Sequence, residues 1–239
     1  MIDSSANNIT LKRDNIFNTK AQTIVNTVNC VGIMGKGIAL VYKLRYPKMF
    51  DLYQKYCNEK IINIGKLWLY KGESNAPWVL NFPTKIHWKY PSKIEHIEKG
   101  LQKFLETYKE KGVTSIAFPL LGAHNGGLDR DQVYDLMIKY LSNCDIPIEI
   151  YEYDPYASDD LFELFKSKWN AIPDVSKKLY TGIRTQKQID TITYAVNSNR
   201  VNSMIVLIEY KGIGLKTMGK CFSLVMKGET PKSLFDKPE

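Results

Sequence analysis

A strand that runs into a glycine-rich loop and then a helix is the feature that most constrains how this chain folds. It lies in the stretch Thr23–Leu40, where a β-branched run precedes a loop containing Gly32, Gly35 and Gly37. Such a loop can hold a phosphate, because unpaired backbone N–H groups and the dipole of the following helix point at the same place. The spacing is not that of a Walker loop, since no Gly-Lys-Ser/Thr follows.

A second segment repeats this arrangement. A buried-strand pattern over residues 115–118 runs into a loop with three more glycines (Gly122, Gly126 and Gly127), and a helical pattern begins at Asp129. In an open α/β sheet, ligands bind where such loops leave the carboxyl ends of the strands. Two loops of this kind indicate a diphosphate that is held from both sides.

The remaining pattern alternates strands and helices. Strand-like segments fall near residues 8–12, 22–28, 65–71, 77–82, 114–119 and 147–152, and helical patterns near 36–58, 92–111 and 129–142. This predicts an α/β fold with a mixed, largely parallel sheet flanked by helices. After a polar break at residues 154–160 only helical patterns follow, near 161–169, 186–196, 202–209 and 216–226. We therefore expect two domains, residues 1–155 and a small helical domain over 160–239.

The two loops resemble those of a macrodomain, the three-layer α/β/α fold that binds ADP-ribose. The motifs are NTVNCVGIMGKGIA at residues 26–39 and FPLLGAHNGGLD at residues 118–129. Between them, NFPTKIHW at residues 81–88 resembles the corresponding stretch of the DarG-type antitoxins, macrodomains that remove ADP-ribose from thymidine bases in DNA. The branch that hydrolyses terminal ADP-ribose on protein carboxylates is also similar. The resemblance covers roughly residues 8–155.

Two residues are candidates for catalysis. Lys85 follows a predicted strand, so we expect it to project from a loop at the ligand edge of the sheet, and the resemblance makes it the catalytic lysine. A partly desolvated lysine has a lowered pKa, so Lys85 either attacks ribose C1″ as an amine or polarises the ribose as its ring opens. Asp129 begins a helix and is either a plain N-cap or an acid/base that works with Lys85.

The resemblance also implies contacts to the rest of ADP-ribose. We expect Asn29 to bind the distal ribose hydroxyls, Asn26 to tie the loop to the sheet, and the side-chain oxygen of Asn15 to accept from the adenine amino group, where many macrodomains have aspartate. His124 is expected to be structural rather than catalytic. The full set of expected ligand contacts is Asn15, Ile16, Asn29, Gly32, Met34, Gly35, Gly37, Gly122, Ala123, His124, Asn125, Gly126, Gly127 and Leu128.

Charge and motifs point to a polyanionic partner. The formal net charge is +8, which exceeds what ADP-ribose requires, and it fits either nucleic acid or a lysine-rich solvated surface. Trp88 and Lys89 form either a platform for a base or a packed turn. The tail segment 208–218 resembles a helix-hairpin-helix turn, in which Gly212, Gly214 and Lys216 would face a phosphate; a glycine-rich helix connection without a ligand is the alternative.

Cysteine usage and hydropathy bound the remaining classes. The four cysteines are widely spaced, without a C-x-x-C pair, and only three histidines are present. This argues against a zinc site or a disulfide framework and favours a reducing compartment. No N-terminal apolar run has the length of a signal or membrane segment. We expect a cytoplasmic protein that needs neither a metal nor a cofactor.

Three functions follow from these residues. The first is a glycohydrolase that removes ADP-ribose from a nucleic-acid base, most simply thymidine in DNA, as the antidote to a DNA ADP-ribosyltransferase toxin that it either binds directly or only counteracts. The second keeps the fold and changes the substrate to protein-carboxylate ADP-ribose, O-acetyl-ADP-ribose or ADP-ribose 1″-phosphate. The third is a reader that binds ADP-ribose without turning it over.

Overall fold

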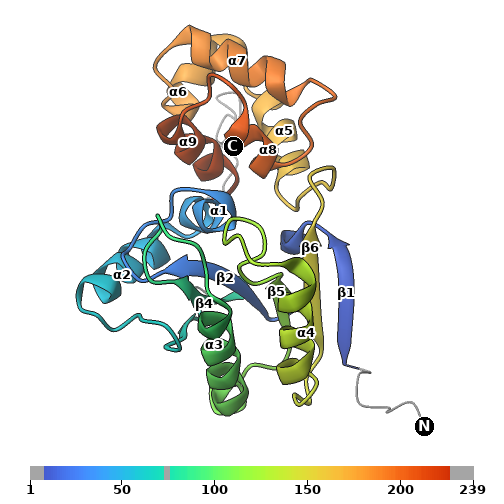
Figure 1. The fold of residues 1–239 in the computed structure, drawn as a ribbon. Helices are drawn as coiled ribbons and strands as arrows, with labels where there is room; N and C mark the ends of the chain where they lie inside the picture. Colours follow the sequence, from blue (N-terminus) through green and yellow to red (C-terminus); the bar gives the residue numbers. More distant parts are fainter. Residues whose placement is uncertain (1–7, 73–75, 227–239) are drawn as a thin grey trace, which may run out of the picture. The chain divides into compact units, whose positions relative to one another are not determined.

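The computed structural model describes residues 8–72 and 76–226 (Figure 1). The chain divides into two compact units, Met1–Asp154 and Pro155–Glu239. The division falls in the polar stretch that separates the alternating α/β pattern from the helical pattern. The first unit carries the glycine loops, and the second carries the hairpin-like segment.

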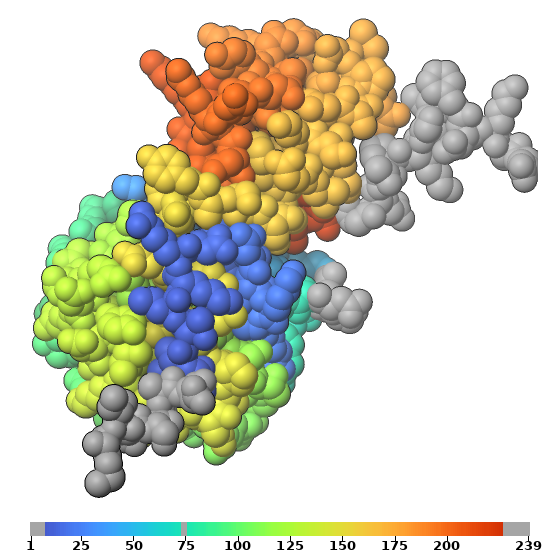
Figure 2. Space-filling view, turned by 90° about the vertical axis from the view of Figure 1, so that its right-hand side faces the viewer, coloured from blue at the N-terminus to red at the C-terminus, as the bar shows by residue number. Residues whose placement is uncertain are grey.

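The first unit is built on one six-stranded sheet in the order β1-β6-β5-β2-β4-β3. The strands are β1 (Ile9–Asp14), β2 (Thr23–Asn29), β3 (Trp68–Tyr70), β4 (Trp78–Lys85), β5 (Ile116–Pro119) and β6 (Ile148–Tyr153). All neighbouring pairs are parallel except β3 and β4. The predicted mixed, largely parallel sheet is therefore confirmed. Strand β1 forms one edge and lies at the surface in Figure 2, where it is blue.

Helices cover both faces of this sheet, because successive strand residues point to opposite sides. On one face, Leu80 and Phe82 join the core formed with α3 (Ile94–Thr107) and α4 (Arg130–Leu141). On the other face, Asn81 donates to the sulfur of Met49 in α2 (Pro47–Asn58) at 3.6 Å. The result is the three-layer arrangement that the macrodomain resemblance implies.

The helix that we expected over residues 36–58 is two helices, α1 (Gly37–Arg45) and α2. Tyr46 separates them with φ −129° and ψ 69°. Pro47 follows it, and proline both lacks an N–H and disfavours the helical conformation of the residue before it. The break lets α2 turn its Met49, Tyr53 and Cys57 side toward the core.

An extra residue interrupts the pairing of β2 with β4. Val28 pairs with Pro83, but Asn29 pairs with Lys85, so Thr84 has no partner in β2. His96 of α3 contacts the carbonyl oxygen of Thr84 through Nδ1, at 3.3 Å. Such a bulge re-aims the side chains that follow it. It brings Lys85 beside the start of the first glycine loop.

The second unit is helical. It contains α5 (Phe162–Ala171), η3 (Asp174–Ser176), α6 (Lys177–Thr181), α7 (Gln186–Val196), α8 (Met204–Glu209) and α9 (Leu215–Met226). The short elements η3 and α6 were not predicted from the sequence. Trp169 of α5 is fully buried, and its Nε1 donates to Oγ1 of Thr193 in α7 at 3.0 Å.

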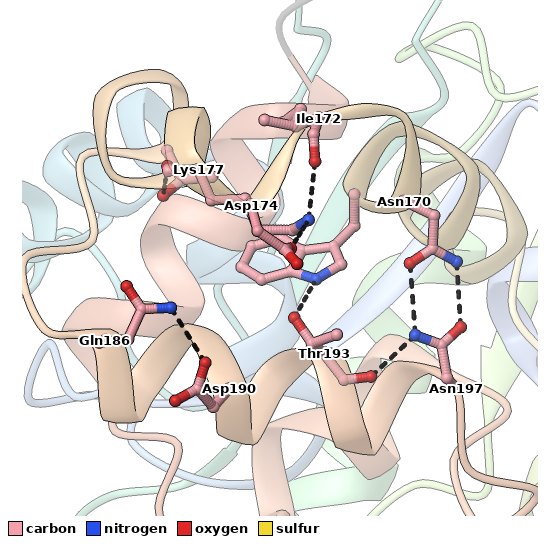
Figure 3. Close-up of polar contacts among 10 residues, drawn as sticks. Asn170, Ile172, Asp174, Lys177, Gln186, Asp190, Thr193 and Asn197 are labelled. Carbon is pink, nitrogen blue, oxygen red and sulfur yellow. Dashed lines mark hydrogen bonds and ion pairs between the residues drawn. The ribbon is translucent and has the colours of Figure 1, made fainter.

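A buried lysine fixes these short elements in place. Lys177 is 3% exposed, and its amine donates to the carbonyl oxygen of Ile172 and to the carboxylate of Asp174, both at 2.7 Å (Figure 3). A buried ammonium group is tolerated only when it is paired in this way. A reciprocal amide pair between Asn170 and Asn197 then joins α5 to the end of α7.

In the parts of the chain that the structure describes, no helix has the length and apolar character that crossing a bilayer requires.

Candidate active site

The first glycine loop, which follows β2, is shaped by the side chain of Asn29. Its Oδ1 accepts from the backbone N–H groups of Val31 and Ile33, at 3.0 and 3.3 Å, and its Nδ2 donates to the carbonyl oxygen of Ile33 at 2.5 Å. Asn29 is 7% exposed. The structure therefore gives this amide a loop-holding role as well. Asn26 ties the loop to the sheet as expected, because its Nδ2 donates to Oδ1 of Asn81 in β4 at 2.9 Å and to the sulfur of Met34 in the loop at 4.0 Å.

Helix α2 supports the same loop through two residues that the sequence analysis missed. The hydroxyl group of Tyr53 donates to the carbonyl oxygen of Asn29 at 2.7 Å, and Nε2 of Gln54 donates to that of Gly32 at 3.2 Å. Burial raises the pKa of Tyr53, so its hydroxyl stays a donor. The signal was available, because Met49, Tyr53 and Cys57 follow each other at intervals of four.

The loop side chain of Met34 points away from solvent. It is 1% exposed, and its sulfur lies 4.0 Å from Nδ2 of Asn26. Only the backbone of Met34, like that of Gly32 and Gly35, remains for a ligand contact.

The two glycine loops meet at Gly37. This residue has φ +59°, and a Cβ placed on it would lie 2.4 Å from Nδ2 of Asn125 in the second loop. Only glycine combines this backbone conformation with such a close approach. The structure therefore brings together the two loops that the sequence assigned to one diphosphate.

The second loop, Gly122–Leu128, closes on itself and on the segment before α3. Leu128 donates to the carbonyl oxygen of Gly122 at 3.1 Å, and Ser92 donates through its backbone N–H to that of Gly126 at 2.9 Å. A Cβ on Gly126 would lie 2.1 Å from the oxygen of Gly122 and 2.6 Å from Oγ of Ser92. The loop is therefore packed too closely at Gly126 for any other residue.

Ser92 is a third residue that the sequence analysis missed. Its side chain is buried beneath Gly122 and Gly126, and its hydroxyl group has no hydrogen-bond partner among the described residues. A buried hydroxyl group without a partner is unfavourable and requires an explanation. No sequence pattern marks a single serine for this role.

Lys85 lies between the two loops. It is the last residue of β4 rather than part of the loop after it, and its amine donates to the carbonyl oxygen of Asn125 at 2.6 Å. Partial burial lowers the pKa of Lys85, which increases the neutral fraction of the amine. The strand register sets it beside Asn29. The side chain therefore links the end of one loop's strand to the backbone of the other loop.

Asp129 forms the N-cap of α4. Its Oδ1 accepts from the backbone N–H of Gln132 at 2.9 Å, in the geometry that satisfies an otherwise unpaired donor of the first helical turn. Ala123 and the exposed His124 precede it in the loop, and the ring of His124 meets that of Tyr153 edge-on with centroids 6.2 Å apart.

Asn15 and Ile16 lie at the end of β1, at the same edge of the sheet. Both are buried, and Oδ1 of Asn15 accepts from the backbone N–H of Phe17 at 3.2 Å, which starts the short helix η2 (Ile16–Asn18). The oxygen that we expected to accept from adenine thus has a partner within the chain. Nδ2 of Asn15 is the unpaired atom of this side chain among the described residues.

Comparison with known proteins identifies the fold. The family model for the macro domain matches residues 25–137. The solved macrodomain of Mycobacterium tuberculosis DarG is 40% identical with a TM-score of 0.58, and the match covers 60% of this chain and 96% of that one. The chain belongs to the macrodomain family.

Two further relatives show which branch is similar. The structure of Thermosipho africanus DarTG in complex with ADP-ribose is 36% identical with a TM-score of 0.60, over 72% of this chain and 45% of that one. The Mycobacterium tuberculosis DNA ADP-ribosyl glycohydrolase is 42% identical over 132 residues, which are 54% of this chain and 38% of that protein. The chain spans about two fifths of the length of the curated relatives it matches.

Proposed function

We propose that this protein is an ADP-ribosyl glycohydrolase that removes ADP-ribose from a nucleic-acid base, most simply thymidine in DNA. The observation that carries the proposal is the position of Lys85, which pairs with Asn29 at the start of the first glycine loop and whose amine donates to Asn125 in the second. The similarity of the chain to proteins named DNA ADP-ribosyl glycohydrolase supports the choice of substrate.

In this reaction water adds to ribose C1″, the bond from C1″ to the base nitrogen breaks, and a proton returns to the base. Lys85 acts at C1″ in one of two ways. As a neutral amine it forms a bond to C1″ while the bond to the base breaks, and water then hydrolyses the bond between Lys85 and C1″ to release ADP-ribose. As an ammonium group it polarises the opening ribose, and water adds to C1″ directly. Because the pKa of Lys85 is lowered, a larger fraction of its amine is neutral than in an exposed lysine at the same pH, which favours the first way. Asp129 would move the proton through Oδ2, because Oδ1 caps α4.

The glycine loops would hold the diphosphate through backbone N–H groups, with no need for a metal ion. In the part of the chain that the structure describes, no group of three or more His, Cys, Asp or Glu side chains could hold one. Asn15 and Ile16 would lie next to the adenine, and Asn29 would act on the distal ribose through the loop that it shapes.

The hairpin-like segment would hold the nucleic-acid backbone. Helix α8 ends at Glu209, and a turn with φ +97° at Gly212 leads into α9. Around a Cβ placed on Gly214, the described residues leave open space within 4 Å. Gly212, Gly214 and Lys216 are exposed, so backbone N–H groups and a lysine can reach a phosphate together. If the segment is only a connection between two helices, replacing these residues would leave the affinity for nucleic acid unchanged.

The biological role that fits is the reversal of a DNA ADP-ribosyltransferase in the cytoplasm. The transferase would supply the modified base, and this protein would restore it. The fusion protein of Thermosipho africanus carries both activities in its name. Because one protein carries both activities there, this protein would also bind the transferase directly.

The test is an oligonucleotide that carries ADP-ribose on one thymidine, with the products identified by mass. We expect the wild type to release ADP-ribose and Lys85→Ala to release none, while Lys111→Ala, a change at an exposed lysine, retains the wild-type rate. Micromolar binding of ADP-ribose without release by the wild type would overturn the proposal.

The pairing of Lys85 with Asp129 that the resemblance to the carboxylate-specific branch implies favours a second candidate substrate, ADP-ribose on a protein carboxylate. Release from a glutamate-linked peptide, with none from the oligonucleotide, would select it. Tight binding of ADP-ribose that Lys85→Ala does not alter, with no release from either substrate, would select the reader.

A further inference from the structure

Three aromatic rings follow Lys85 directly. They belong to His87, Trp88 and Tyr90, and we call residues 86–90 the ring segment. The ring centroids of His87 and Trp88 are 5.5 Å apart at an interplanar angle of 27°, and those of His87 and Tyr90 are 5.6 Å apart at 51°. The rings therefore form one connected group in which His87 is central.

Backbone and side-chain hydrogen bonds fix the ring segment. Tyr90 donates to the carbonyl oxygen of His87, and the N–H of Lys89 donates to Nδ1 of the same histidine, both at 3.2 Å. Cys30, at the start of the first glycine loop, donates to the carbonyl oxygen of Ile86 at 3.2 Å. The rings are thus carried by a turn that is bonded to the ligand loop.

These rings do not serve the core. Trp88 is 50% exposed and Tyr90 is 66% exposed, whereas Trp169 in the second unit is fully buried. A contiguous group of exposed aromatic rings is typical of a surface that contacts a partner. The packed turn that we considered for Trp88 is therefore not what the structure shows.

The charge around the rings indicates the partner. Residues 85–94 contain three lysines and no acidic residue. The amine of Lys89 lies 5.4 Å from the centre of the Trp88 ring. Exposed ring faces beside the amine of Lys89 match a nucleotide, in which an apolar planar base is joined to a phosphate. If the partner were a protein, we would expect this part of the surface to carry acidic side chains as well as basic ones.

We propose that the ring segment binds the nucleotide adjacent to the ADP-ribosylated one, with its base on Trp88 and its phosphate near Lys89. This inference rests on the proposed function. Lys85 and Trp88 are three positions apart in the chain, a span of at most about 10 Å. Stacked nucleotides advance about 3.4 Å along one strand, so a neighbouring base comes within reach when the modified one is at Lys85. The ring segment thus makes the site read an oligonucleotide rather than a lone modified nucleoside.

The experiment compares two substrates, a short oligonucleotide with ADP-ribose on its central thymidine and ADP-ribosyl-thymidine itself. For the wild type we expect kcat/KM to be about tenfold higher on the oligonucleotide, because each base stacked on an aromatic ring contributes roughly that factor. Trp88→Ala should remove this advantage and leave the rate on the nucleoside unchanged. Trp88→Phe, which keeps a ring, should retain most of it.

Tyr156→Ala serves as the control, because Tyr156 is 85% exposed and lies outside the first unit. Calorimetric binding of ADP-ribose, equal in all variants, shows that the ligand loops are intact. An equal loss on both substrates in Trp88→Ala would overturn the inference and leave the proposed function standing. Failure of the wild type to cleave either substrate would overturn the proposed function, and with it this inference.

Discussion

The amine of Lys85 donates a 2.6 Å hydrogen bond to the backbone carbonyl oxygen of Asn125. The bond joins the end of β4 to the second glycine loop, while the side-chain amide of Asn125 rests against Gly37 of the first loop. One residue of the second loop therefore touches both the candidate catalytic lysine and the other loop. A replacement in either loop at this contact should therefore change the position of the Lys85 amine.

The first prediction concerns the protonation of Lys85. Burial lowers its pKa, so raising the pH should deprotonate Lys85 before the exposed lysines, with a midpoint below the ordinary 10.5. The methyl resonances of reductively dimethylated protein report each lysine separately, and Lys85→Ala identifies the relevant one. In the interval between the lowered pKa and 10.5 the unfolded chain binds more protons, so this group makes stability increase with pH. A midpoint at or above 10.5 would contradict the burial of the amine.

The second prediction separates the cap from catalysis at Asp129. Asparagine caps helices as well as aspartate does, so Asp129→Asn should leave the melting temperature unchanged. If the carboxylate moves a proton, kcat should fall by about 10²- to 10⁴-fold. Asp129→Ala should in addition lose about 1 kcal/mol of stability. Full activity in Asp129→Asn would restrict this residue to the cap that the structure shows.

The third prediction uses two buried serines. Ser92→Ala should stabilise the protein by about 1 kcal/mol, because it removes a buried hydroxyl group that lacks a partner among the described residues. Ser203→Ala should destabilise it by about 1 kcal/mol, because Oγ of Ser203 caps α8 by accepting from Val206 at 3.3 Å. Denaturant unfolding measures both changes. Destabilisation by Ser92→Ala would show that its hydroxyl group is paired in solution.

The fourth prediction concerns the second loop. In Gly126→Ala the new methyl group would overlap the backbone oxygen of Gly122, so the loop must shift. We expect a loss of about 1–3 kcal/mol in stability and a loss of ADP-ribose affinity, measured by thermal unfolding and calorimetry. Gly35→Ala is the matched control for stability, since its nearest neighbour would be an ordinary contact at 3.7 Å. Unchanged affinity in Gly126→Ala would separate this loop from the ligand.

Much of the fold was visible in the sequence because strands and glycine loops follow local rules. Pro47 marks the break at Tyr46 in the sequence. The apolar pattern continues on both sides of it, however, so we expected one helix there. The short helix α6 was missed because it depends on Lys177, whose burial is satisfied by Ile172 and Asp174. From the sequence alone, a lysine is expected to lie at the surface.

At the candidate site, residue types were easier to predict than their partners. The loops and Lys85 were found from motifs, whereas the position of Lys85 within β4 differs from the expected loop. Tyr53 and Ser92 escaped notice because their roles arise from contacts between segments distant in sequence. The contact of Asn15 with adenine stays a prediction, and the sequence did not show that its side-chain oxygen also accepts from the backbone N–H of Phe17.

The unpaired Thr84 in β4 has a consequence for how this chemistry is encoded. Side chains alternate between the two faces of a strand, so a shift of one residue moves every later side chain to the opposite face. Removing one residue between Val79 and Thr84 would leave too few residues for both the unpaired position and the pairing of Lys85 with Asn29, so one of the two would be lost. The chemistry of this chain thus depends on how many residues β4 contains, as well as on which residues they are.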